Sequence, residues 1–585
     1  MNDTTDEITP PLQEKLIRKR IAEIPLLQAV EQRLGLKDIL KHYIKPHGNE
    51  TMPAVESLLL LAFNIACGRQ PLYELDAWIA KLDDGLLTID WEPQPHAAFS
   101  NQPQGVFNDD RFGRALDKLY QADRASMITA IAVRVVQATH LDLSQLHNDS
   151  TSVRTTGKMP RKTSTGLHFT HGHSKDHRPD LKQVVFSLTI SADGAIPIHC
   201  KAYPGNTTDD TTHIETWNTL RRIAGKADFL YVADCKVCTN KQLSHIVAHG
   251  GKVVTLMPNT WKEVGRLKNQ QRAKPSSKQR ILRRLIPNGG KQYETFYRLT
   301  GEYLTDQGGY RLHWIYSTEK KQRDRLSRDK MLKKVEAQLT ELSGKINVRK
   351  LRTHEQIQQR AEEILATAGA EDFYHLHVDA VKQSERVQIG KGRPGKHTQY
   401  RTRTETVHTL SWTRNIVALK NEKHVDGLFP ILSTEPSMSA KEALLAYKYQ
   451  PNLEKRFCQL KGIHHVAPTL FKKVERVEAI LFLFYLALIL QAVIEREVRQ
   501  QMDSKGIEAL PLYPEHRLSY HPTTAKIFDQ FQDTTVSYLM VDGHLSKEYR
   551  DDLDPLRRQI LALLKITEAD YWRSTGYVKL KWEQK

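Results

Sequence analysis

The hydrophobic pattern divides the chain into a helical first part and a strand-rich second part. Apolar residues recur at helical spacing from Leu26 to Leu36, from Glu56 to Phe63 and from Arg114 to Gln137. This pattern predicts helices over residues 1 to about 140, and strands are expected from Leu141 onward. The chain therefore begins with a helical region and continues into an α/β region.

Short apolar runs between residues 183 and 257 have the lengths expected of buried strands. The first two runs flank Ala192-Asp193-Gly194, which is a turn signal and predicts a β-hairpin. The predicted elements are strands at 183–190 and 196–202, a helix at 211–223, a strand at 229–234, a helix at 240–247 and a strand at 253–257. Together with a strand after Leu141, this order is the one expected of an RNase H-like core.

A strongly charged stretch then interrupts the pattern. Residues 262–285 are densely basic, residues 320–368 predict one or two charged amphipathic helices, and residues 386–403 form a basic segment with glycine and proline. The apolar runs at 416–419 and 427–432 predict strands. Regular apolar periodicity returns only after this stretch.

The charge balance favours a polyanionic partner. The 585 residues include 86 basic and 68 acidic side chains, which gives a net charge of +18. Such an excess predicts salt-sensitive binding to nucleic acid, although a solvated basic surface would have the same composition. The five cysteines are odd in number and scattered, which fits a reducing cytoplasm.

One apolar run could be mistaken for a membrane span. Residues 479–494 contain Gln491 and are bounded by Glu478 and Glu495, and a span needs about 20 residues. We therefore expect a buried helix and no membrane association. The acidic, polar residues 1–7 also argue against a signal peptide.

Three acidic residues stand out as candidate ligands of metal ions. Glu454 and Lys461 are seven residues apart, nearly two helical turns, in a helix that we expect to begin at Pro451. Asp234 ends the apolar run at 229–234, and Asp149 lies far upstream, before Ser-Thr-Ser. Carboxylates suit Mg²⁺, so three acids in this order suggest two-metal phosphoryl transfer. Taken alone, Asp149 could instead cap a turn.

The chain resembles insertion-sequence transposases of the DDE type, in the IS-four superfamily and closest to its 1634-type branch. The family signature Y-x2-R-x3-E-x6-K is met by Tyr447, Glu454 and Lys461, with Gln450 where the arginine belongs. Further segments typical of that branch are residues 108–117, 172–180, 205–209 and 392–394. The resemblance runs from about residue 20 to about residue 500.

The resemblance implies an α/β protein with an RNase H-like catalytic core. A large β-containing insertion would interrupt this core, and an all-helical N-terminal domain would precede it and bind DNA ends. The implied regions are 1–140 (N-terminal domain), 141–260 (first part of the core), 261–439 (insertion), 440–505 (second part of the core, with the Glu454 helix) and 506–585 (C-terminal region, with a helix expected at 556–566).

The resemblance also implies roles for single residues. Asp149, Asp234 and Glu454 would hold two Mg²⁺ ions, with Mn²⁺ able to substitute. The residues implied in DNA binding are Lys461, which would hold a backbone phosphate, Tyr447, Gln450 and Arg456. Gln450 cannot give the bidentate phosphate grip of an arginine, so Lys448 or Arg456 would compensate.

The implied function is that of a cytoplasmic, Mg²⁺-dependent DNA transposase. It would bind terminal inverted repeats, cut at the element ends and join the 3′ ends to target DNA, with two protomers pairing two ends as a homodimer. Two alternatives remain: an RNase H-like nuclease that cuts without joining, and a catalytically decayed DNA-binding protein.

Other motifs allow weaker interpretations. Cys235 and Cys238 could bind zinc, but a lone C-x2-C lacks its second pair. His171, His173 and His177 are more typical of a structural or phosphate-facing loop than of a metal site. Trp412 could hold a flipped base, although a core position is the simpler expectation.

Overall fold

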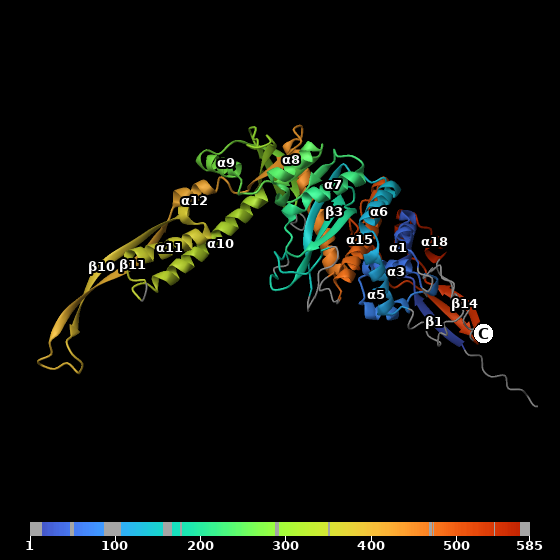
Figure 1. Cartoon of the computed structure of the whole chain (residues 1–585), viewed down its shortest axis with the longest axis horizontal. Coiled ribbons are helices and arrows are strands. Elements are labelled where there is room, and N and C mark those ends of the chain that lie inside the picture. Colours follow the sequence, from blue (N-terminus) through green and yellow to red (C-terminus); the bar gives the residue numbers. More distant parts are fainter. Residues whose placement is uncertain are drawn as a thin grey trace, which may run out of the picture. The chain divides into compact units, whose positions relative to one another are not determined.

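The computed structural model of the chain describes residues 14–46, 52–86, 107–155, 166–175, 178–286, 292–348, 351–466, 471, 473–542 and 544–573. The protein is a mixed α/β chain that divides into two compact units, whose elements are labelled in Figure 1. Unit 1 comprises Met1–Val254 and Ala446–Lys585, and unit 2 comprises Thr255–Leu445. The predicted insertion, residues 261–439, falls within unit 2.

A mixed sheet with the strand order β4-β3-β2-β5-β6 forms the centre of unit 1. β2 pairs antiparallel with β3 and parallel with β5, β3 pairs antiparallel with β4, and β5 pairs parallel with β6. The elements are β2 (Gln145–Arg154), β3 (Gln183–Ser191), β4 (Pro197–Pro204), α7 (His213–Ala224), β5 (Leu230–Val232), α8 (Asn240–Ala248) and β6 (Lys252–Leu256). All the elements predicted between residues 183 and 257 are confirmed, within two residues at their ends.

The turn between β3 and β4 is fixed by a long helix, α15 (Val474–Ser504). Gly194 has φ +79°, and a Cβ at this position would lie 2.6 Å from the Arg496 side chain of α15. Arg496 also donates two hydrogen bonds to the Asp193 carboxylate, at 2.8 and 2.5 Å. The predicted Asp-Gly turn is therefore held from outside the hairpin.

α15 is the core helix of unit 1. It packs against α1 (Ile24–Leu34), α3 (Ala54–Ala66), α5 (Asp109–Gln121) and β4. Its 31 residues are long and apolar enough to cross a membrane, but 94% of its most apolar window is buried inside the protein. The prediction of a buried helix at residues 479–494 is confirmed.

The two ends of the chain share a small sheet in unit 1. β1 (Glu14–Arg20) pairs antiparallel with β13 (Thr535–Val541), which pairs with β14 (His544–Arg550). The prediction of an all-helical N-terminal region is therefore wrong at β1. The strand forms because its partner, more than 500 residues later, supplies the backbone hydrogen bonds. The remaining N-terminal α-helices are α2 (Leu36–Tyr43), α4 (Leu75–Ile79) and α6 (Arg124–Thr139).

The C-terminal region contains the helix that was expected at residues 556–566. This helix is α17 (Pro555–Leu563), and Asp554 caps its first turn by accepting a hydrogen bond from Arg557 N at 2.8 Å. The neighbouring helices are α16 (Thr524–Asp529) and α18 (Glu568–Arg573).

Unit 2 contains an antiparallel sheet with the order β12-β9-β8-β7. Its strands are β7 (Lys278–Leu285), β8 (Tyr293–Leu299), β9 (Arg311–Ser317) and β12 (Leu428–Ser433), and α9 (Lys262–Ala273) precedes them. The strand predicted at 427–432 is confirmed as β12. The strand predicted at 416–419 is wrong, because Asn415 caps a helix there, α12 (Ile416–Glu422), and Ile416 and Val417 are exposed.

The rest of unit 2 consists of two helices and a long hairpin. One or two charged helices were expected between residues 320 and 368, and the structure has two, α10 (Thr318–Ser343) and α11 (His354–Ala368). The hairpin pairs β10 (Tyr374–Gln388) with β11 (Tyr400–Arg414). Among its described residues, unit 2 therefore combines the strands β7 to β12 with the helices α9 to α12.

Candidate active site beside β2 and β5

Two of the three predicted acids lie at the same level of neighbouring strands. The parallel register pairs His147 of β2 with Val232, the last residue of β5. Asp149 and Asp234 each follow these partners by two residues, so Asp149 lies within β2 and Asp234 lies just beyond the end of β5. Because adjacent strands are about 4.8 Å apart, the two half-buried carboxylates belong to neighbouring positions of the sheet.

The carboxylate of Asp149 is paired with a lysine. Lys175 Nζ donates to Asp149 Oδ1 at 3.0 Å and to the Ser150 carbonyl oxygen at 2.7 Å. Asp149 Oδ1 also accepts from Ser150 N at 2.7 Å. Lys175 was not among the predicted site residues, although it lies in residues 172–180, a segment that supported the family resemblance.

Asp234 begins a short helical turn after β5. Its Oδ1 accepts a hydrogen bond from Lys236 N at 2.9 Å, which caps the turn Cys235–Val237. Burial and the charge of Asp234 raise the pKa of the Cys235 thiol. Among the described residues, no group of three or more His, Cys, Asp or Glu side chains is placed to hold a metal ion, so zinc at Cys235 and Cys238 gains no support.

Glu454 lies on α14 (Pro451–Cys458), which begins at Pro451 as predicted. Tyr447 belongs to the preceding helix, α13 (Ala440–Lys448), and Gln450 lies between the two helices. Glu454 is exposed, whereas Tyr447 is half-buried and Gln450 is buried. The signature residues are therefore distributed over two helices.

Gln450 connects the start of α14 with the strand that carries Asp149. Gln450 Nε2 donates to the Asn148 carbonyl oxygen at 3.0 Å, and Gln450 Oε1 lies 2.8 Å from His147 Nδ1. Because a carbonyl oxygen can only accept, these contacts place the Gln450 oxygen toward His147. The buried amide therefore acts as an internal link, and this position does not fit the predicted DNA contact.

The same contacts define the tautomer of His147. Nδ1 must carry the proton to donate to Gln450 Oε1, and Nε2 then accepts from Gln145 Nε2 at 2.8 Å. Burial lowers the pKa of His147 to about 4, while the bond to Gln450 opposes the shift. His147 is thus neutral near pH 7 and holds Gln450 in one orientation.

The electrostatics of Tyr447 connect it with the three acids. Burial raises the pKa of the Tyr447 hydroxyl, and the negative charges of Asp234, Cys235, Asp149 and Glu454 raise it further. The phenol therefore keeps its proton and can donate a hydrogen bond. Asp149, Asp234 and Glu454 thus all act on one phenol, but the structure does not gather them into a metal-ligand cluster.

Arg456 is placed differently from the prediction. Its buried guanidinium donates to Glu495 Oε2 at 2.9 Å, to the Ala195 carbonyl oxygen at 2.9 Å and to the Gly194 carbonyl oxygen at 3.2 Å. With the bond to Gln459 Oε1 at 2.7 Å, four of its five N–H groups have internal acceptors, and the side chain is buried. The predicted DNA contact of Arg456 is replaced by a structural one, which ties α14 to α15 and to the β3–β4 turn.

The helical spacing between Glu454 and Lys461 is not regular. α14 ends at Cys458 and continues into a π-helical turn, Gln459–Ile463, which contains half-buried Lys461. A count of 3.6 residues per turn therefore no longer gives the angle between the two side chains. Such π-helical turns are frequent at functional sites.

The structure also places most of the residues with weaker interpretations, the histidines near residue 175 and Trp412. His171 and His173 are exposed, and His171 Nδ1 lies 3.3 Å from the Pro179 carbonyl oxygen, while His177 lies outside the described residues. Trp412 is partly buried against the hydrophobic cluster at the base of the β10–β11 hairpin. This position agrees with a core tryptophan.

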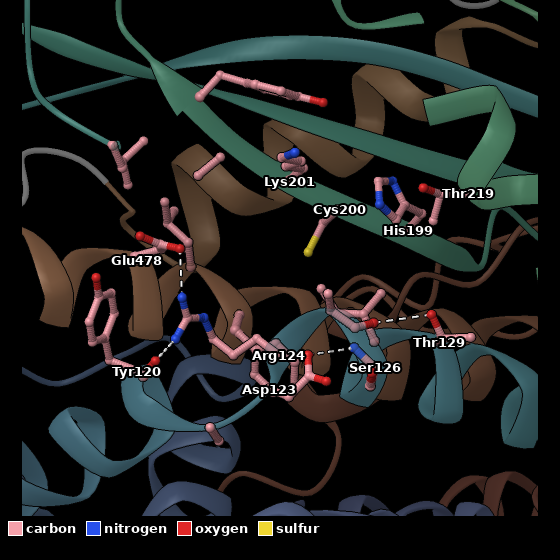
Figure 2. A pocket seen from close by; sticks show the side chains of 18 of the residues that line it. Tyr120, Asp123, Arg124, Ser126, Thr129, His199, Cys200, Lys201, Thr219 and Glu478 are labelled. Atoms are coloured by element: carbon pink, nitrogen blue, oxygen red, sulfur yellow. Dashed lines mark hydrogen bonds and ion pairs between the residues drawn. The ribbon is translucent and has the colours of Figure 1, made fainter. Parts of the chain in front are cut away.

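A cavity of about 1270 Å³ lies elsewhere in unit 1, beside β4, α6 and α15 (Figure 2). Four of its charged side chains form two ion pairs, Arg124 with Glu478 at 2.7 Å and Lys201 with Glu215. Asp149, Asp234 and Glu454 do not line it. The candidate site is therefore the acid-bearing part of β2 and β5 and not this cavity.

Comparisons with known proteins give limited guidance. A family described as "Domain of unknown function (DUF4277)" matches residues 16–133. The comparison with curated proteins found no match. Among solved structures, the chain is similar to a piggyBac transposase synaptic complex with hairpin DNA, at 8% identity over 95% of this chain and 83% of that chain, with a TM-score of 0.36. A likeness at this level does not by itself establish the fold or function of this chain.

Proposed function

We propose that the chain is a metal-dependent DNA transposase that cuts DNA at the ends of its element and joins the 3′ ends to target DNA. One observation carries the proposal: Asp149 lies on β2 and Asp234 just beyond the end of β5, its parallel neighbour, and Gln450 links the start of the Glu454 helix to the strand of Asp149. This is the arrangement expected of an RNase H-like core interrupted by an insertion. The resemblance of residues 20 to 500 to DDE transposases supports the same function.

The donor set fits Mg²⁺, because three carboxylates supply hard oxygen ligands. Asp149, Asp234 and Glu454 would hold two ions, with Mn²⁺ able to replace them. When bound, such ions activate the attacking oxygen and stabilise the leaving oxygen of an in-line displacement. In the structure Lys175 compensates the charge of Asp149.

Residues around the acids would position the DNA. Tyr447 keeps its proton and can donate to a carboxylate or phosphate oxygen. Lys175 and Lys461 are cations that can contact backbone phosphates, as the resemblance implies for Lys461. Terminal inverted repeats as substrate, two protomers pairing two ends and a cytoplasmic location belong to the proposal through the resemblance.

The proposal is tested by cleavage and joining of a labelled DNA end that carries the element's own flanking repeats, with Mg²⁺. We expect Glu454→Gln to lower both reactions by at least a hundredfold, a common effect of removing one group that stabilises transition-state charge. Full activity in this variant would overturn the assignment of Glu454.

Glu442→Gln is the matched control. Glu442 is exposed on α13, where Ser439 N donates to Glu442 Oε2 at 2.8 Å and Glu442 N donates to Ser439 Oγ at 3.3 Å. Glutamine also fits this capping box, so the control should keep full activity. Nicks without joined product in the native chain would favour the nuclease, and binding without either reaction would favour the decayed DNA-binding protein.

A further inference from the structure

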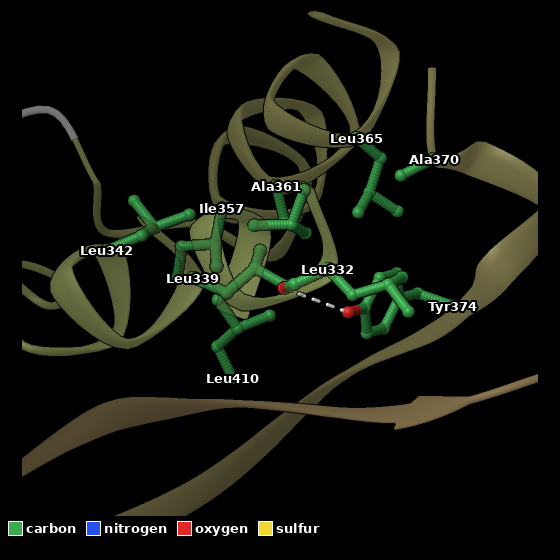
Figure 3. Close-up of a cluster of buried hydrophobic side chains, with 10 residues drawn as sticks. Leu332, Leu339, Leu342, Ile357, Ala361, Leu365, Ala370, Tyr374 and Leu410 are labelled. Atoms are coloured by element: carbon green, nitrogen blue, oxygen red, sulfur yellow. Dashed lines mark hydrogen bonds between the residues drawn. The ribbon is translucent and has the colours of Figure 1, made fainter. Parts of the chain in front are cut away.

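The β10–β11 hairpin of unit 2 is anchored at its base. Tyr374 and Leu410, which lie near the open end of the hairpin, are buried against α10 and α11 (Figure 3). The Tyr374 hydroxyl donates to the Leu332 carbonyl oxygen at 3.2 Å. The buried members of this cluster are Leu332, Val335, Leu339, Leu342, Ile357, Ala361, Leu365, Ala370, Tyr374 and Leu410. The base of the hairpin is thus fixed on two helices.

Beyond its base the hairpin is not packed on either face. Burial alternates along β10 as far as Val378, but every residue from Asp379 to Arg386 is exposed, as are residues 400–406 of β11. At about 3.3 Å per residue, the part from Asp379 to Gln388 extends roughly 30 Å. Figure 1 shows the hairpin running past α10 and α11. Two strands without a core gain little stability of their own, so packing within the described part of unit 2 does not explain this length.

The charge of the outer hairpin fits a polyanion. Residues 386–403 contain six basic and no acidic side chains: Arg386, Lys391, Arg393, Lys396, Arg401 and Arg403. All six are exposed. Duplex DNA carries about one negative charge per 1.7 Å of its axis, so a basic hairpin can meet several phosphates at once.

The tip is narrow and has a defined shape. Ile389 N donates to the Gln399 carbonyl oxygen at 2.8 Å, and Thr398 N donates to the Gly395 carbonyl oxygen at 3.1 Å. Gly392 has φ +140°, which side-chain-bearing residues rarely adopt, and a Cβ there would meet nothing within 4 Å. Between Gly392 and Gly395 stand only Arg393 and Pro394, so one long side chain projects between two glycines.

We propose that this tip enters the minor groove of A·T-rich duplex DNA, with Arg393 in the groove and the neighbouring basic side chains at the phosphates. The minor groove is about 6 Å wide, and it is narrower and more negative in A·T tracts, which attracts arginine. The glycines let the backbone approach the groove closely. Pro394 supplies the kind of apolar wedge with which minor-groove proteins open a base step.

The inference rests on the proposed function only in taking DNA as the ligand, and its test needs no cleavage. Binding of the full chain is measured on three duplexes of equal length that contain A·T, G·C or inosine·cytosine tracts. Inosine·cytosine lacks the minor-groove amino group of G·C but keeps its major-groove pattern. We expect the A·T and inosine·cytosine duplexes to bind alike and about tenfold more tightly than G·C, since only the minor groove distinguishes them in this way.

Substitution of two exposed arginines distinguishes the contribution of the tip to DNA binding from that of the rest of the hairpin. Arg393→Ala should abolish the preference, whereas the matched control Arg401→Ala should weaken binding to all three duplexes equally and lower the salt slope by about 1. Inosine·cytosine binding like G·C, equal binding to all three, or a preference that survives in Arg393→Ala would each overturn the inference.

The cleavage assay with Glu454→Gln distinguishes failure of the inference about the hairpin tip from failure of the proposed function. Glu454-dependent cleavage without the A·T preference would overturn only the inference about the tip. The preference without cleavage would support the tip as a DNA-binding element and overturn the transposase.

Discussion

The Glu454 helix in unit 1 and the β10–β11 hairpin in unit 2 use their arginines in opposite ways. Arg456 on the helix is paired with Glu495 at 2.9 Å, and the two side chains are only 4% and 5% exposed. Arg393 at the hairpin tip is exposed. An arginine close to a candidate catalytic acid in sequence therefore does not by itself indicate a DNA contact, because burial decides what the charge can reach.

The difference follows from what each region has to do. A site that holds carboxylates at fixed positions needs rigid support, and Arg456 and Gln450 connect its helix to the turn and the strand beside it. A groove-binding element needs reach and exposed charge, which the hairpin has because only its base is packed. Substitutions of buried residues around α14 and of exposed residues on the hairpin therefore test this difference.

The largest effect is expected for Arg456→Ala. Removing Arg456 leaves the buried Glu495 to a more distant cation, Arg499 at 3.6 Å, which costs about 3 kcal/mol of unfolding free energy, the lower end for a broken buried ion pair. Denaturant unfolding of the full chain, followed by hydrogen exchange in peptides from α14 and α15, measures this loss. Arg393→Ala is the matched control and should leave the unfolding free energy within about 0.5 kcal/mol. Unchanged stability of Arg456→Ala together with weaker DNA binding would restore the DNA contact predicted from the sequence.

The acids of the site could be selected from the sequence because their signals are local. Asp234 ends a short apolar run, and Glu454 and Lys461 have a fixed spacing. The partners of Arg456 could not be found in this way, because Glu495 is 39 residues downstream and the Ala195 carbonyl is 261 residues upstream. Whether an arginine contacts DNA or the core depends on such distant partners.

The same limit explains the errors in the fold. β3 to β6 follow from apolar runs, but β1 depends on β13 at the other end of the chain. The run at Ile416 is too short for periodicity to distinguish strand from helix, and the cap at Asn415 decides for a helix.

The second-largest effect is expected on acidification, which should destabilise the buried region around His147. His147 has a folded pKa of about 4, below its ordinary value of 6.5, because burial disfavours the charged ring. Between pH 4 and 6.5 the unfolded chain binds the proton more strongly, so this stabilisation is complete above pH 6.5 and is lost as the pH falls toward 4. The shift corresponds to about 3 kcal/mol at most.

The pH effect is measured by hydrogen exchange of the α14 peptide between pH 7.5 and 4.5, corrected for intrinsic rates. His147→Gln should make the protection of this peptide less dependent on pH. The same pH dependence in the variant and in the native chain would show that His147 is not the group that titrates.

A smaller loss is expected when the arginine of the family signature is restored by Gln450→Arg. Gln450 Oε1 accepts from His147 Nδ1, and an arginine has only donors to place against that N–H. Two buried donors facing each other should cost about 2 kcal/mol, the common penalty for an unsatisfied buried group. Unfolding free energy measures the loss, and Gln450→Glu, which keeps an acceptor toward His147, is the comparison variant. An increase in stability on Gln450→Arg would contradict the internal role of Gln450.

The smallest effect is expected at an exposed ion pair, Arg414 with Glu336, at the base of the hairpin. Arg414 Nε donates to Glu336 Oε1 at 2.7 Å, a contact as short as that of the buried Arg456, but the side chains are 44% and 30% exposed. Solvent screens such a pair and the free side chains gain entropy, so Arg414→Ala should cost less than about 1 kcal/mol. The unfolding free energy is measured for Arg414→Ala, Glu336→Ala and the double variant, to isolate the pair from the Tyr374 hydroxyl that also contacts Glu336. A coupling energy as large as that at Arg456 would show that bond geometry, and not burial, sets the difference between the two regions.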